Sequence, residues 1–148
     1  MSGQKLLNIV IVVFLLAIIF VGCKDDNPTD ANYDTALVGS WNVDKIRWEG
    51  QSEKGSYDRG QLDSLGTIWT MTLKSDKTVE MTTNYCCALT DYSGSWSATK
   101  YELTLKLKAS NSSEVKVEVY QFVVENARLI INWQLKSGTL YYGEFIKL

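Results

Sequence analysis

The spacing of apolar residues divides the chain into two parts. Residues 6–22 form a continuous apolar run with a single polar member, Asn8. From Leu37 onward, apolar and polar residues alternate with a period of two, which is typical of strands that bury one face. No stretch of this second part has the apolar spacing of an amphipathic helix. The pattern therefore predicts an all-β domain behind an N-terminal apolar segment.

Eight alternating segments predict eight strands. Because short polar turns join most of them, neighbouring strands are expected to be antiparallel, each with its apolar face buried. Eight such strands can close into an up-and-down barrel that is either filled by side chains or holds one small ligand, and an open sandwich is the alternative. The last strand, within residues 140–148, has no evident inward face. The other apolar faces consist of Leu37, Gly39, Trp41 and Val43; Trp69, Met71 and Leu73; Val79 and Met81; Trp96 and Ala98; Leu103, Leu105 and Leu107; Val115, Val117 and Val119; and Leu129, Ile131, Trp133 and Leu135.

One connection is much longer than the others. Residues 49–66 contain four glycines and several charged side chains, and they separate the first strand from the second. Loops of this length in a compact domain are often lids or binding loops. The segment is interpreted either as such a loop or as a surface insertion without a function of its own.

The N-terminal apolar run has the features of an export signal. Lys5 precedes the run, and Gly22 ends it. A short basic region, an apolar core and a small residue at its end are typical of a secretory signal peptide, so residues 1–22 are expected to form a signal helix. Phe20-Val21-Gly22-Cys23 resembles a bacterial lipobox. The resemblance implies that Cys23 is acylated and the signal removed, whereas an uncleaved membrane anchor is the alternative.

The residues after Cys23 are polar and include Pro28. Such a composition predicts a flexible tether over residues 23–35. Cys23-Lys24-Asp25-Asp26 also resembles a lipoprotein export signal that some bacteria with an outer membrane use for delivery to the cell surface. The expected location is therefore the cell envelope, as an outer-membrane lipoprotein that faces either the periplasm or the cell exterior.

Several short motifs along residues 36–148 occur in a familiar order. They are Leu-Val-Gly-Ser-Trp at 37–41, Met-Thr-Leu-Lys-Ser-Asp-Lys-Thr-Val at 71–79, Ser-Gly-Ser-Trp-Ser at 93–97, Glu-Leu-Thr-Leu at 102–105 and Tyr-Tyr-Gly-Glu-Phe-Ile-Lys at 141–147. In this order the chain resembles the lipocalin-like lipoproteins of Gram-negative bacteria. The resemblance implies an eight-stranded barrel over residues 36–148, in which Gly39 allows close packing and Trp41 plugs one end. In that family a glycine usually occupies the position of Lys77.

Large apolar side chains on the expected inward faces are the candidate binding residues. They are Trp41, Trp69, Met71, Met81, Trp96 and Trp133. An aromatic-lined pocket of this kind suits a small hydrophobic or amphipathic ligand. The alternative is that the same side chains simply fill a small barrel, since little volume is left at an eight-strand radius.

Composition excludes several classes of function. The chain has no His, which removes Ser-His-Asp and Cys-His nucleophile systems and every His-ligated metal or haem site. A net charge of −2 gives no electrostatic reason to expect a nucleic-acid partner. Acidic residues are numerous on the loops without the spacing of a calcium loop. We therefore expect neither catalysis nor a metal or other cofactor.

Cys86 and Cys87 are adjacent in the sequence. In an oxidising compartment they could form a vicinal disulfide, which would be strained because adjacent Cα atoms lie closer together than in ordinary disulfides. Two free thiols or an intermolecular bridge are the alternatives.

Together, these features favour an outer-membrane-anchored lipoprotein whose barrel binds a small hydrophobic or amphipathic ligand. The alternative function is a non-catalytic structural or interaction subunit of a cell-envelope complex, with a fully packed barrel and an envelope protein as its partner. The acyl chains at Cys23 would make the membrane a partner in either case.

Overall fold

The computed structural model describes residues 31–85, 88–135 and 137–148 of the chain. The expected signal helix at 1–22, most of the expected tether, the acylation site Cys23, and Cys86 and Cys87 lie outside the described residues. In the described part, no helix is long and apolar enough to cross a membrane. The elements are α2 (Ala31–Leu37), β1 (Gly39–Glu49), β2 (Lys54–Tyr57), α3 (Arg59–Ser64), β3 (Trp69–Leu73), β4 (Thr78–Thr83), β5 (Thr90–Ala98), β6 (Glu102–Ala109), β7 (Val115–Glu125), β8 (Arg128–Gln134) and β9 (Leu140–Lys147).

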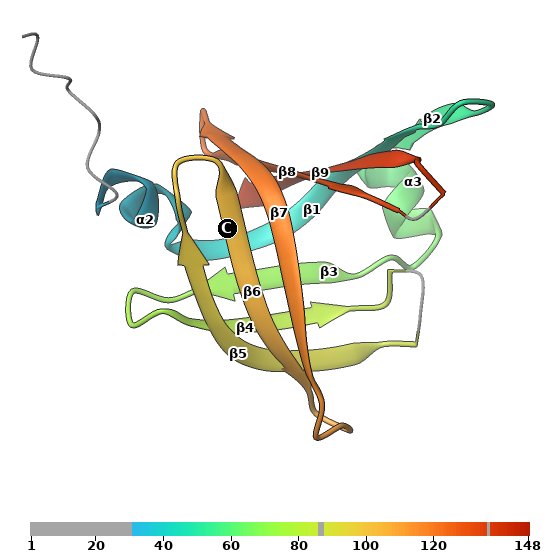
Figure 1. The fold of residues 1–148 in the computed structure, drawn as a ribbon. Coiled ribbons are helices and arrows are strands. Elements are labelled where there is room, and N and C mark those ends of the chain that lie inside the picture. The colour runs from blue at the N-terminus through green and yellow to red at the C-terminus, as the bar shows by residue number, and fades with distance from the viewer. Residues whose placement is uncertain (1–30, 86–87, 136) are drawn as a thin grey trace, which may run out of the picture.

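The strands form a closed antiparallel barrel (Figure 1). From β3 to β9 each strand pairs with the next one along the chain, and β1 pairs with both β3 and β9. The ring thus consists of β1 and β3 to β9, which are eight strands. This arrangement confirms the predicted up-and-down barrel and excludes the open sandwich. It is also consistent with the lipocalin-like resemblance.

The inward faces follow the sequence alternation on most strands. Met71 pairs with Met81 across β3 and β4, and both side chains are buried. Leu103, Leu105 and Leu107 are buried along β6, as their spacing predicted. On β8 the buried residues are Leu129 and Ile131, whereas β9, whose face the sequence did not decide, buries Gly143 and Phe145.

The prediction of which face of β7 points inward is wrong. Val115, Val117 and Val119 point outward, and each is more than half exposed. The alternate positions of the same strand include Tyr120 and Phe122, which are both buried. Because alternation fixes one face for the whole strand, burying the two large aromatic rings turns the valines to the solvent. The register agrees, since Lys116 lies opposite the inward residue Leu107 and Glu118 opposite the inward residue Leu105.

The connection expected to be a structureless loop over 49–66 contains two elements. The short strand β2 pairs only with the second half of β1, outside the closed ring. Helix α3 begins at the N-cap Asp58, whose side chain accepts from Gln61 N while Gln61 Oε1 accepts from Asp58 N, each at 3.0 Å. Buried Leu62 fixes the helix to the core. The helix escaped prediction because its six residues are too few to show helical periodicity.

The N-terminal boundary of the domain lies slightly before residue 36. Residues 31–35, expected to be tether, belong to α2, and Leu37 at the end of this helix is fully buried rather than part of β1. The buried Trp41 donates from Nε1 to Leu37 O at 2.8 Å. Asp34 forms an ion pair of 2.5 Å with Lys77 in the turn between β3 and β4. These contacts hold α2 across one end of the barrel.

The two ends of the barrel therefore differ. The end at α2 also carries the short turns between β3 and β4, β5 and β6, and β7 and β8. Lys77 in the first of these turns has φ +67°, a left-handed conformation that favours glycine. The opposite end carries the remaining connections, including β2 and α3. We call these the closed end and the open end.

Candidate functional site

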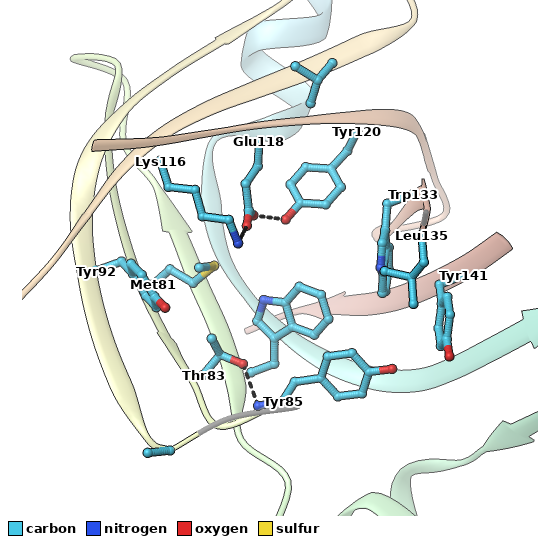
Figure 2. A pocket seen from close by; sticks show the side chains of 13 residues that line it. Met81, Thr83, Tyr85, Tyr92, Lys116, Glu118, Tyr120, Trp133, Leu135 and Tyr141 are labelled. Carbon is cyan, nitrogen blue, oxygen red and sulfur yellow. Dashed lines mark hydrogen bonds and ion pairs between the residues drawn. The ribbon is translucent and has the colours of Figure 1, made fainter. Parts of the chain in front are cut away.

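A cavity of about 490 Å³ lies at the open end of the barrel. This volume is within the range of about 300–1,000 Å³ that small-molecule sites occupy. Figure 2 shows the side chains around it. The lining residues come from β3, β4, β5, β7, β8 and β9 and the connections beyond them: Trp69, Met81, Thr83, Tyr85, Ala88, Tyr92, Lys116, Glu118, Val119, Tyr120, Trp133, Leu135 and Tyr141.

The cavity exists because β7 and β8 separate. They pair only between Gln121–Glu125 and Arg128–Asn132, although β7 extends back to Val115. Figure 1 shows β7 running away from β8 beyond this region. Lining residues lie on both sides of the separation, with Lys116 and Glu118 on β7 and Trp133 on β8. The barrel wall thus opens sideways as well as at its end.

Five of the six aromatic residues that line the cavity contact one another through their rings. Trp69 stacks on Tyr85 with a centroid distance of 5.3 Å, and Trp133 stacks on Tyr141 at 5.5 Å. Trp69 and Trp133 meet edge to face at 5.5 Å, and Tyr120 meets Trp133 edge to face at 6.2 Å. These offset and edge-to-face arrangements are the favourable ones for aromatic pairs. They hold the wall of the cavity in a defined shape without a ligand.

A single acidic side chain faces this aromatic wall from β7. Glu118 accepts a hydrogen bond from Tyr120 Oη and forms an ion pair of 2.5 Å with Lys116 Nζ (Figure 2). The two charged residues are two positions apart on one strand, so both point to the same face. Burial first, and then the neighbouring Glu118 charge, raise the pKa of Tyr120 well above its usual value. Tyr120 is therefore a neutral hydrogen-bond donor to Glu118 at physiological pH.

The other notable polar group in the wall is the indole nitrogen of Trp69. Trp69 is only 6% exposed, and its Nε1 has no hydrogen-bond partner among the described residues. A buried donor without an acceptor costs about 1–3 kcal/mol.

Three of the six predicted binding residues line the cavity, namely Trp69, Met81 and Trp133. The other three, Trp41, Met71 and Trp96, are buried but do not line it. Trp41 packs at the closed end, and Trp96 donates from Nε1 to Lys74 O at 3.0 Å in the turn at the same end. One end of the barrel is thus filled by side chains, and the other holds a cavity.

The cavity residues that the sequence did not reveal are the polar and tyrosine members, above all Lys116, Glu118 and Tyr120. Alternation assigned the opposite face of β7 to the interior, so these residues were placed outside. The sequence feature that indicates the true inward face is the pair Tyr120 and Phe122. These two side chains share the face of Glu118 and are larger than the valines on the other face of β7.

Among residues 31–85, 88–135 and 137–148, no group of three or more acidic or Cys side chains could hold a metal ion. The vicinal pair Cys86 and Cys87 lies outside these residues and stays a prediction. Comparison of the chain with protein-family models, with curated proteins and with solved structures found no match. The fold that these residues form is a closed eight-stranded antiparallel β-barrel with a cavity at one end.

Proposed function

We propose that the protein binds a small amphipathic molecule in the open end of its barrel and performs no catalysis. The observation that carries this proposal is the cavity of about 490 Å³, whose aromatic wall faces the inward pair Lys116 and Glu118. Apolar walls with a few polar groups are typical of small-molecule sites. A barrel that served only as a structural or interaction subunit would have no need for a partly buried carboxylate such as Glu118 in this wall.

Charged residues on the inner face of a barrel are costly for stability alone. Glu118 is 19% exposed and takes the place that a leucine or valine would occupy in a packed core. Tyr120 and Lys116 offset part of that cost by binding both carboxylate oxygens. Their presence supports a role in ligand recognition.

We further propose that the domain is held at the outer membrane by acyl chains on Cys23. Helix α2, which follows the proposed tether, lies at the closed end of the barrel. The cavity lies at the other end, so the proposed attachment at Cys23 leaves the open end free of the tether. This arrangement suits capture of a ligand from the surrounding aqueous phase.

Calorimetric titration of the full-length acylated protein in lipid nanodiscs with octanol tests the binding function, with empty nanodiscs as the reference. Saturable heat beyond that of the empty nanodiscs is expected. Leu135→Trp would place a large ring at the cavity, and Leu89→Trp is the matched control because Leu89 is also exposed but does not line the cavity.

We expect Leu135→Trp to weaken octanol binding at least tenfold and Leu89→Trp to leave it unchanged. A wild-type titration that equals the empty nanodiscs would contradict the proposed function. Equal binding by both variants would place the octanol outside the cavity and contradict the proposed site.

A further inference from the structure

The two charges in the cavity differ in how firmly they are held. The Glu118 side chain is 19% exposed and accepts from the buried Tyr120, whereas the Lys116 side chain is 67% exposed. An exposed lysine leaves an ion pair more readily than a partly buried carboxylate does, because exposed ion pairs contribute little to stability. A half-buried carboxylate that loses its cation pays a larger desolvation cost. The acid is therefore the fixed charge, and the lysine is an exchangeable counter-ion.

The aromatic wall, like Glu118, favours a cation over an anion. The faces of Trp and Tyr rings carry partial negative charge, so they attract cations and repel anions. Trp69, Tyr85, Trp133 and Tyr141 all line the cavity that Glu118 faces. An anionic head would need Lys116 to leave Glu118, and the carboxylate would then remain uncompensated beside a second negative charge. A cationic head avoids both costs.

We propose that the ligand carries an organic ammonium head, which replaces Lys116 on Glu118, and an apolar body, which packs on the aromatic wall. The ammonium donates to Glu118 while Tyr120 keeps its own hydrogen bond to the same carboxylate. Lys116 turns outward to the solvent when the ligand binds. The occupied site then holds one carboxylate and one ligand cation.

The chemical class is thus an amphipathic amine rather than a fatty acid.

Three probes with one alkyl chain test the head group: octylammonium, octanol and octanoate, titrated into the full-length protein in nanodiscs below their micelle concentrations. The wild type should bind octylammonium about tenfold more tightly than octanol, and octanoate more weakly than octanol. Glu118→Gln should lower octylammonium affinity about tenfold, to the level of octanol, because the ammonium loses its charge-assisted hydrogen bond to the carboxylate. Lys116→Gln should raise it about threefold by removing the competing cation.

Matched controls remove the same charges from the outer face of β6. Glu102→Gln and Lys108→Gln change the net charge equally but concern exposed residues that do not line the cavity. Neither should alter the order of the three probes. If they shift octylammonium binding as strongly as the β7 variants do, the preference comes from the overall charge and the inference fails.

This inference rests on the proposed binding function. The outcomes of the titrations distinguish a failure of the ammonium head from a failure of the binding function. Equal affinities for the three probes would overturn the ammonium head and leave the binding function intact. If octanoate binds most tightly and Lys116→Gln abolishes its binding, the ligand carries an anionic head and not an ammonium head. Saturable binding by none of the three would overturn both.

Discussion

Trp41 is the side chain whose removal should damage the barrel most. It is fully buried, and its indole nitrogen donates to Leu37 O at 2.8 Å, which joins α2 to β1. Truncating a buried Trp to Ala typically costs about 3–5 kcal/mol. The orphaned Leu37 carbonyl adds about 1 kcal/mol. Because domains of this size are stable by only about 5–15 kcal/mol, Trp41→Ala should remove a large part of the total.

A second variant separates the two contributions. Trp41→Phe keeps most of the ring but loses the hydrogen bond to Leu37, so it should cost about 1–3 kcal/mol. Trp133→Ala is the matched control at the open end, where Trp133 is only partly buried and lines the cavity. It should cost less than Trp41→Ala.

Urea denaturation followed by circular dichroism measures the free energy of unfolding of the wild type and of the three variants. We expect the order Trp41→Ala, then Trp41→Phe, then wild type, from least to most stable. A loss below about 1 kcal/mol in Trp41→Ala would refute the assignment of Trp41 as the plug of the closed end. A larger loss in Trp133→Ala than in Trp41→Ala would refute the division into a filled and an open end.

Three further changes test the fold. Gly94→Ala should destabilise by about 3 kcal/mol or fail to fold, because its Cβ would lie 1.8 Å from Lys106 O; a normal melting temperature would contradict the close β5–β6 approach. Leu62→Ala should cost about 2–5 kcal/mol in a denaturant titration, whereas exposed Leu65→Ala should cost almost nothing; equal losses would argue against α3 as part of the core. Burial raises the pKa of Tyr120 in the folded state, so the free energy of unfolding should fall as the pH rises above about 10, where the unfolded side chain ionises. Tyr120→Phe should make this fall less steep in unfolding curves measured at alkaline pH. Identical slopes for the wild type and the variant would count against burial of the hydroxyl.

The fold was predictable because one-sided alternation is strong on most strands. Leu103, Leu105 and Leu107 on β6 leave only one choice of buried face, and short turns leave only antiparallel neighbours. On β7 both faces carry apolar residues, so periodicity alone does not decide between them. The decision came from the size of Tyr120 and Phe122 and from pairing with β6.

The sequence predicted only some of the residues that line the cavity. The reason differs from that for the face of β7. Trp69 and Met71 share the buried face of β3, yet only Trp69 lines the cavity. Alternation assigns a residue to the interior but says nothing about its depth along the barrel axis. Depth depends on where β7 leaves β8, which is a property of the pairing between Gln121–Glu125 and Arg128–Asn132 and not of any local motif.

The indole N–H resonances of the five tryptophans test the ligand site most directly. Trp69 and Trp133 line the cavity, whereas Trp41 and Trp96 hold hydrogen bonds at the closed end. When octylammonium is titrated into the protein labelled with nitrogen-15, the Trp69 and Trp133 signals should move together and saturate, while those of Trp41 and Trp96 stay in place. Equal shifts of all the indole N–H signals, or no shift of the Trp69 and Trp133 signals, would contradict a ligand site at the open end of the barrel.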